Sequence, residues 1–268
     1  MEKDASCLVA SCKKRQIGFS VKRVGLFIPC YIDIIYPNVA LATYKLLTKL
    51  GFSVDYPLNQ TCCGQPFLNS GVKDEAKALA NRFYNIFKDF DYIVAPSASC
   101  IATVKFGYKD LLDSKEYLEL KEKSFEICEF LTDVVKIDSI DAKFNHKVGF
   151  HQSCHGLREL NLARSSELNL PYYSKPLKLL KMVDGIEIVD LKRADECCGF
   201  GGVFSVIEPD VSVKMGQDRV QDHIDSGAEY IVGYDSSCLM HMQGVAKKQK
   251  QNIKFLHIVE ILAGMVEQ

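Results

Sequence analysis

The sequence predicts an α/β protein of two duplicated halves, each a small parallel sheet with flanking helices and a cysteine cluster at the carboxyl ends of the strands. Three observations lead to this prediction. Short apolar runs alternate with helical patterns, which is typical of doubly wound parallel sheets. The same landmarks occur twice in the same order along the chain. Cysteines follow the ends of the predicted strands, where α/β proteins place their sites.

The duplication is visible in four pairs of matching segments. The pairs are 24–30 with 148–154, 62–64 with 197–199, 91–100 with 229–238, and 129–131 with 260–262. Two of these segments are Cys-Cys-Gly triplets, a combination that chance rarely produces once in a chain of this composition. Two such triplets, each flanked by matching landmarks, indicate that the second half is a copy of the first.

In the first half, three strands are predicted, each followed by a helix. The strand at 23–28 is a short apolar run that ends at Pro29. The next helix begins at Pro37 and ends at Gly51, as helix-start prolines and helix-end glycines indicate. A strand at 52–56, an amphipathic helix at 73–90, a strand at 92–95 and a helix at 98–109 complete this half.

The second half repeats this pattern. Strands are predicted at 147–151, 186–191 and 230–233, and helices at 176–183, at 209–226, from Ser236 onward and at 258–266. The joint between the halves falls at 137–144, a polar and helix-breaking stretch. We therefore predict an N-terminal extension over 1–22, a first domain over 23–140 and a second over 141–268.

Composition excludes several classes of protein. The 33 Lys and Arg residues are matched by 34 Asp and Glu residues, so no basic surface for nucleic acid is predicted. The least charged stretch, 24–44, is interrupted by prolines and Asp33, so no transmembrane segment is predicted. The N-terminus offers no signal-peptide core before Lys13. These observations together predict a cytoplasmic globular protein.

The eleven cysteines are the most informative residues. In a cytoplasmic chain, metal binding or redox chemistry is favoured over disulfides. Each half supplies four thiols from three loops at one sheet edge, and four soft thiolates suit Zn²⁺ or an iron–sulfur cluster. Cys7, Cys12 and Cys128 lack counterparts, and Cys128 is predicted to be a core residue. The candidate ligands are Cys30, Cys62, Cys63, Cys100, Cys154, Cys197, Cys198 and Cys238.

Three histidines surround the second cysteine set and have no histidine counterparts in the first: His151, His155 and His241. They are either structural residues in a crowded loop, or they make the second site chemically different from the first. A neutral imidazole ligates soft metals, so His241, three residues after Cys238, is a candidate ligand.

The segments VGLFIPCYID, QTCCGQPFLNSG, PSASC, HQSCHGLREL, CCGFGGVFS and DSSCLMH resemble those of the cysteine-rich CCG-domain family. The resemblance covers nearly the whole chain from Val24. This family includes the B subunit of heterodisulfide reductase and the iron–sulfur subunits of glycolate oxidase and anaerobic glycerol-3-phosphate dehydrogenase. The chain is most similar to the lactate-utilization branch of this family. The resemblance implies an iron–sulfur subunit of a cytoplasmic L-lactate dehydrogenase complex that forms pyruvate. Its implied partners are a ferredoxin-like iron–sulfur subunit and a third subunit of that complex.

The sequence departs from the fullest family motif at one position in each half. That motif ends Cys-x-x-Cys, and its five cysteines hold a non-cubane [4Fe–4S] cluster. Here Thr103 and His241 stand at the final position. A four-cysteine [4Fe–4S] cluster, a cluster completed by His241 and a single zinc ion remain open. The corresponding functional alternatives are a zinc-stabilised scaffold subunit and a thiol–disulfide reductase subunit.

Overall fold

The computed structural model describes residues 22–266. The predicted N-terminal extension over 1–22, with Cys7 and Cys12, lies outside the described residues except for residue 22. Residues 267 and 268, the end of the predicted second domain, also lie outside them.

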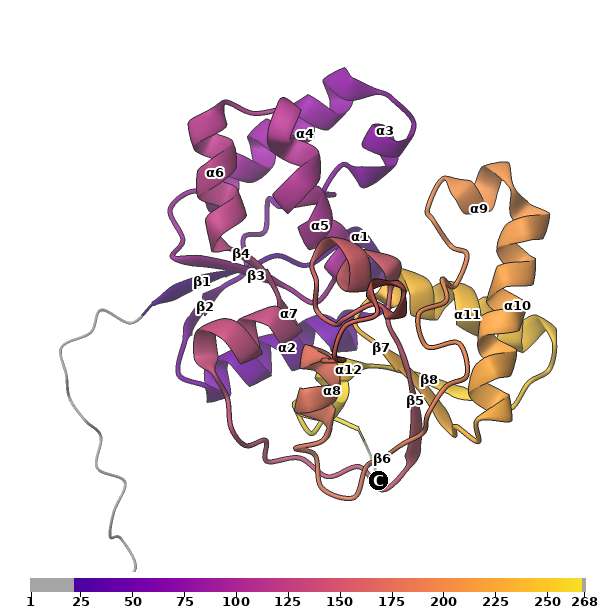
Figure 1. The fold of residues 1–268 in the computed structure, drawn as a ribbon. Helices are drawn as coiled ribbons and strands as arrows, with labels where there is room; N and C mark the ends of the chain where they lie inside the picture. Colours follow the sequence, from indigo (N-terminus) through magenta and orange to yellow (C-terminus); the bar gives the residue numbers. More distant parts are fainter. Residues whose placement is uncertain (1–21, 267–268) are drawn as a thin grey trace, which may run out of the picture.

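Two four-stranded parallel sheets form the framework, with helices packed around them (Figure 1). The first sheet has the order β2-β1-β3-β4 and the second the order β6-β5-β7-β8, so the two sheets share one topology. This confirms the predicted fold class and the duplication. The strands are β1 (Arg23–Leu26), β2 (Ser53–Asp55), β3 (Tyr92–Ala95), β4 (Ser124–Glu126), β5 (Lys147–His151), β6 (Glu187–Ile188), β7 (Tyr230–Gly233) and β8 (Lys254–His257).

The fourth strand of each sheet is absent from the sequence-based prediction. β4 pairs with β3, and β8 pairs with β7, each in parallel register. β4 has only three residues and follows α6 (Ser114–Lys123) without a break, so its sequence continues a helical pattern. A strand this short gains its stability from a neighbouring strand, and the local sequence carries no sign of that pairing.

All seven predicted helices are present at or near the expected positions, whereas the helices at 30–35, 65–69, 114–123 and 204–207 were not predicted from the sequence. Those of the first half are α1 (Cys30–Ile35), α2 (Pro37–Lys49), α3 (Gln65–Asn69), α4 (Lys73–Phe87), α5 (Ala98–Phe106), α6 and α7 (Ile127–Glu129). Those of the second half are α8 (Lys175–Leu180), α9 (Phe204–Ile207), α10 (Pro209–Asp225), α11 (Ser236–Lys248) and α12 (Ile258–Leu262). Short π-helical turns occur at Phe130–Val135 and His155–Glu159, and 3₁₀ turns at Gly107–Asp110 and Ser166–Leu168.

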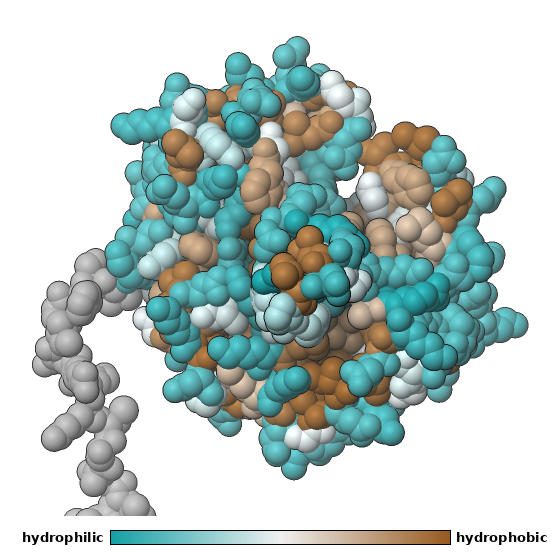
Figure 2. Space-filling model, in the orientation of Figure 1, coloured by the Kyte–Doolittle hydropathy of each residue, from teal (hydrophilic) through white to brown (hydrophobic). Residues whose placement is uncertain are grey.

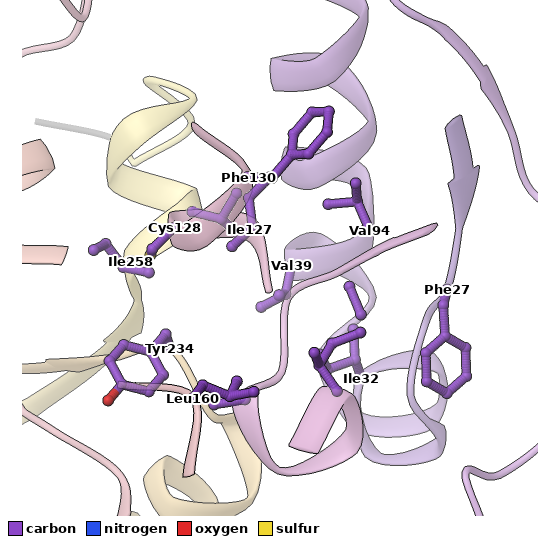
Figure 3. Packing of buried hydrophobic residues seen from close by; sticks show 14 of the residues in the cluster. Phe27, Ile32, Val39, Val94, Ile127, Cys128, Phe130, Leu160, Tyr234 and Ile258 are labelled. Carbon is purple, nitrogen blue, oxygen red and sulfur yellow. The ribbon is translucent and has the colours of Figure 1, made fainter. Parts of the chain in front are cut away.

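One hydrophobic core joins the two halves. It includes Phe27 and Val39 from the first half and Tyr234 and Ile258 from the second, and Figure 3 shows these side chains around the junction. The C-terminal helix α12 packs against both α2 and α8. Cys128 is fully buried in this core, as predicted. The shared core fixes the two sheets relative to each other.

On the face drawn in Figure 2, polar and apolar residues are mixed, and one group of apolar residues lies over α9 and the start of α10. Val206, Ile207 and Val211 are exposed there. None of the helices within residues 22–266 is long and apolar enough to cross a membrane.

Equivalent positions in the two halves carry different buried titratable caps. Glu126 accepts hydrogen bonds from the backbone N–H groups of Cys128 (2.7 Å) and Glu129 (3.3 Å) at the start of α7. His257 caps α12 in the same way, with its Nδ1 accepting from the Val259 N–H at 3.2 Å. Burial raises the pKa of the Glu126 carboxyl to about 8, so the cap is protonated near neutral pH.

This cap predicts a pH dependence of stability. Between the ordinary carboxyl pKa and about 8, folded Glu126 holds a proton that the unfolded chain has lost. Stability therefore falls as pH rises through this window, by up to about 1.4 kcal/mol per pH unit. Glu126→Gln keeps a cap oxygen and removes the titration, so the variant is expected to lose less stability than the wild type between pH 6 and pH 8. Urea unfolding of the metal-free protein measures this, and equal losses in both proteins would contradict it.

Candidate metal centres

The first cysteine set comes from three loops at the carboxyl edge of the first sheet. Cys30 is the first residue of α1, which follows β1. Cys100 lies in the first turn of α5, where its N–H donates to the Oγ of the capping residue Ser97 at 3.4 Å. Cys62 and Cys63 lie in the loop between β2 and α3. We call these four residues the first quartet.

The second cysteine set is positioned in the same way in the second half. Cys154 directly precedes the π-helical turn after β5, and Cys238 lies in the first turn of α11. Cys197 and Cys198 lie in the loop between β6 and α9. We call these four the second quartet. The repeated placement follows from the repeated topology, because equivalent strands end at equivalent loops.

The backbone conformation explains why each Cys-Cys-Gly triplet ends in glycine. Gly64 and Gly199 have φ angles of 83° and 85°, a left-handed conformation that favours glycine. This turn directs the Gly64 N–H to Cys62 Sγ and the Gly199 N–H to Cys197 Sγ, each at 3.4 Å. Each quartet therefore has one thiol that accepts a hydrogen bond from the backbone.

The thiols within a quartet contact one another and share protons unequally. Hydrogen bonds from Cys30 and Cys63, together with the Gly64 N–H, lower the pKa of Cys62 to about 3. Hydrogen bonds from Cys154 and Cys198, with the Gly199 N–H, lower the pKa of Cys197 to about 2. The same hydrogen bonds and burial raise the thiol pKa values of the neighbours Cys30, Cys63, Cys154 and Cys198. Each metal-free quartet thus holds one thiolate ready to bind a cation.

Both quartets line one cavity. All eight predicted ligands border a space of about 790 Å³ that is partly open to solvent. Residues of both halves close it, since Tyr31 packs edge-on against Phe200 with ring centroids 5.9 Å apart. Gln65 Nε2 also lies 3.0 Å from His155 Nε2 across the junction. The arrangement places two soft donor sets opposite each other in a single chamber.

A buried carboxylate joins the two quartets. Asp235 precedes α11, yet its oxygens accept hydrogen bonds from the Ser99 N–H (2.9 Å) and the Ser97 Oγ (3.1 Å) at the start of α5. Ser153 Oγ, beside Cys154, donates to the same carboxylate at 3.4 Å. Asp235 therefore fixes the helix starts that carry Cys100 and Cys238 relative to each other. The sequence gives no sign of this role, because Ser97 and Ser99 lie far from Asp235 in the chain, in the other half.

The cysteine loop of the second half is sterically tighter than that of the first. A Cβ atom at Gly199 would lie 2.5 Å from Met215 Cβ and 2.7 Å from the Ser212 carbonyl oxygen. A Cβ atom at Gly64 would lie 3.5 Å from its nearest neighbour, an ordinary contact with Leu79. A side chain is therefore tolerated less well at Gly199 than at Gly64.

We expect Gly199→Ala to destabilise the protein by about 2–3 kcal/mol and to reduce metal binding at the second quartet. Gly202→Ala is the matched control, because Gly202 also has a positive φ (62°) but nothing within 4 Å of the added Cβ. The control is expected to cost about 1 kcal/mol, from backbone strain alone. Urea unfolding and metal content measure both, and equal effects of the two substitutions would contradict the steric argument.

The three histidines near the second quartet occupy different environments. His155 borders the cavity, with Nδ1 3.7 Å from Cys154 Sγ. His241 lies outside the cavity lining, and its Nε2 is 3.1 Å from the Ser212 carbonyl oxygen. His151, the last residue of β5, has a ring nitrogen that lies with Cys198 Sγ and Cys238 Sγ in one group whose atoms are all within 4.8 Å of one another. Within the described chain, no hydrogen-bond partner reaches either ring nitrogen of His151.

A buried polar cluster backs the second quartet where the first has aromatic rings. Phe27 packs against Phe83 and Phe87 in the first half, with ring centroids 4.9 and 5.8 Å away. In the second half, His151, Arg219 and His223 take these places. Arg219 is completely buried and pairs with Asp222 at 3.1 Å and with His223 at 3.2 Å. Each buried polar group without a hydrogen-bond partner lowers the stability of the fold by about 1–3 kcal/mol. Packing alone therefore does not explain why polar residues occupy these positions.

Comparison with known proteins identifies the family. The family model described as "Cysteine-rich domain" (CCG) matches residues 24–105 and 148–243, one match in each half. The chain belongs to the CCG cysteine-rich domain family. Each matched region of this CCG chain contains one complete quartet, and the unmatched Cys128 lies in the core.

Several relatives are similar to the chain over most of its length, and one solved structure has a similar fold. The chain is 41% identical to lactate utilization protein A of Exiguobacterium sp. over 252 residues, which cover 91% of this chain and 98% of the relative. It is 39% identical to lactate utilization protein A of Macrococcus caseolyticus over 250 residues, with the same coverage. A hypothetical protein from Helicobacter pylori has a similar fold, with a TM-score of 0.62 at 9% identity over 93% of this chain and 50% of that chain.

Proposed function

We propose that this chain is an iron–sulfur subunit of a cytoplasmic complex that oxidises L-lactate to pyruvate, with each quartet holding one cluster. The observation that carries the proposal is the single cavity lined by all eight cysteines. Two separate structural metal sites have no need of a common cavity, whereas two centres that act on one bound molecule both have to border the space that holds it.

The donor sets fit such a cofactor. Cys30, Cys62, Cys63 and Cys100 supply four thiols to one site, and Cys154, Cys197, Cys198 and Cys238 supply four to the other. A bound iron–sulfur cluster supplies one-electron transfer at a potential set by its ligands and surroundings. The Gly64 and Gly199 N–H groups donate to ligand sulfurs, which stabilises thiolate charge. Tyr31 of the first half and Phe200 of the second pack against each other at the border of the cavity.

The substrate is proposed from the relatives, which are named for lactate utilization. We propose a ferredoxin-like iron–sulfur subunit and a third subunit as partners. The test is anaerobic co-purification with these subunits, followed by addition of L-lactate. We expect L-lactate to reduce the clusters, and electron paramagnetic resonance measures this reduction. Clusters that stay oxidised with L-lactate, while dithionite reduces them, would overturn the proposed reaction.

A zinc-stabilised scaffold subunit is the second candidate. The group formed by His151, Cys198 and Cys238 favours it, because imidazole and thiolate together are common zinc ligands. The two candidates differ in composition: a redox subunit contains iron and acid-labile sulfide, and a scaffold contains zinc without sulfide. Elemental analysis of the anaerobically isolated chain separates them.

A further inference from the structure

The second quartet has a buried histidine, His151, beside it, and the first quartet has Phe27 at the equivalent position. His151 is 1% exposed, and neither of its ring nitrogens has a hydrogen-bond partner among the described residues. One of these nitrogens lies within 4.8 Å of both Cys198 Sγ and Cys238 Sγ. On one tetrahedral ion, a nitrogen and a sulfur ligand lie roughly 3.6 Å apart, so small side-chain shifts bring all three atoms onto a shared metal.

The first half shows which kind of side chain occupies the position equivalent to His151 when only packing determines the residue. Phe27, which directly follows β1, is the counterpart of His151, the last residue of β5, and it packs edge-on against Phe83 and Phe87. An imidazole buried at this place without partners has no comparable packing role. Coordination of a bound metal accounts for one of its two unpartnered nitrogens.

The residues around His151 keep its environment polar without using its nitrogens. Gly149, two residues earlier on β5, has no side chain, and a Cβ atom there would lie 2.2 Å from His223 Nδ1. His223 therefore packs directly on the strand, with its ring centroid 6.5 Å from that of His151. The guanidinium group of Arg219 interacts with His223 Nε2 and with the carboxylate of Asp222. The ring of His151 is thus held beside the sulfurs while both of its nitrogens stay available.

We propose that His151 is a nitrogen ligand of the second metal centre, together with Cys198 and Cys238. This inference rests on the proposed function only in requiring a metal at the second quartet, and it holds for an iron–sulfur cluster and for a single ion alike. The two centres of the chain are then chemically different, with thiolates alone in the first half and imidazole plus thiolates in the second.

The test uses the full chain with ¹¹³Cd²⁺ as the metal and [¹⁵N]histidine as the label. Two ¹¹³Cd resonances are expected, one unsplit and one split by direct coupling to a single imidazole nitrogen. His151→Phe, which installs the residue of the first half, is expected to abolish the splitting and leave the other resonance unchanged. His241→Ala and His155→Ala are the matched controls, and both are expected to retain it.

Two results would overturn the proposal: no split resonance in the labelled wild-type protein, or a splitting that disappears in a control variant and persists in His151→Phe. The wild-type spectrum decides even where His151→Phe fails to fold. The outcome is also separable from that of the proposed function. A nitrogen-split resonance in a protein that assembles no iron–sulfur cluster removes the redox function and keeps the ligand. Assembled clusters with no nitrogen coupling to cadmium remove the ligand and keep the function.

Discussion

Cys198→Ser is expected to remove about half of the metal bound by the chain, and Cys63→Ser the other half. Both thiols are buried at the centre of their quartets and contact two neighbouring ligand sulfurs. A serine hydroxyl is a poor ligand for a soft metal, and metal binding is coupled to local folding, so loss of one thiol empties that quartet. Metal analysis per folded chain after anaerobic isolation measures the effect.

Cys128→Ala is the matched control for these two variants. Cys128 is as buried as Cys63 and Cys198 but lies in the hydrophobic core, away from the cavity. Its replacement is expected to lower stability modestly and to leave the metal content per folded chain unchanged. Full metal content in Cys198→Ser would exclude Cys198 as a required ligand, and loss of metal in Cys128→Ala would show that the assay reports general unfolding.

Arg219→Met is expected to destabilise the metal-free protein by about 3–5 kcal/mol, because it leaves a buried charge without its partner. The guanidinium of Arg219 is fully buried, lies 3.1 Å from the carboxylate of Asp222 and hydrogen-bonds to the Arg193 carbonyl oxygen. Asp222 is itself almost fully buried. Removing the cation therefore strands the anion in the interior, and urea unfolding measures the cost.

Lys214→Ala tests an exposed ion pair on the same helix. Lys214 Nζ lies 2.6 Å from Asp218, and the lysine side chain is 67% exposed. Its loss is expected to cost less than about 1 kcal/mol, as is typical of solvent-screened pairs. If Arg219→Met were no more destabilising than Lys214→Ala, the buried cluster behind the second quartet would not be a structural requirement of the fold.

The sequence was sufficient to predict the two sheets and to bring all eight cysteines to the strand ends. Strand–helix alternation fixes which edge of a parallel sheet carries the loops, so spacing alone placed Cys30 and Cys100 together. β4 and β8 escaped prediction because their stability comes from pairing with β3 and β7. Their residues have no alternation long enough to indicate a strand.

The single cavity could not be predicted in this way. It depends on how the two halves dock, which the shared core and the Asp235 contacts to Ser97 and Ser99 determine. The buried Arg219 was hidden for a related reason. On an isolated α10 a charged residue indicates a solvated face, and only the packing of this helix on β5 places that side chain inside.

The iron and acid-labile sulfide content of the anaerobically isolated full chain shows directly whether the quartets hold iron–sulfur clusters. We expect iron and sulfide together in the wild type. Both are expected to be halved in Cys63→Ser and in Cys198→Ser, and nearly absent when the two substitutions are combined. Stoichiometric zinc without sulfide in the wild type, or iron that survives the double substitution, would contradict these expectations.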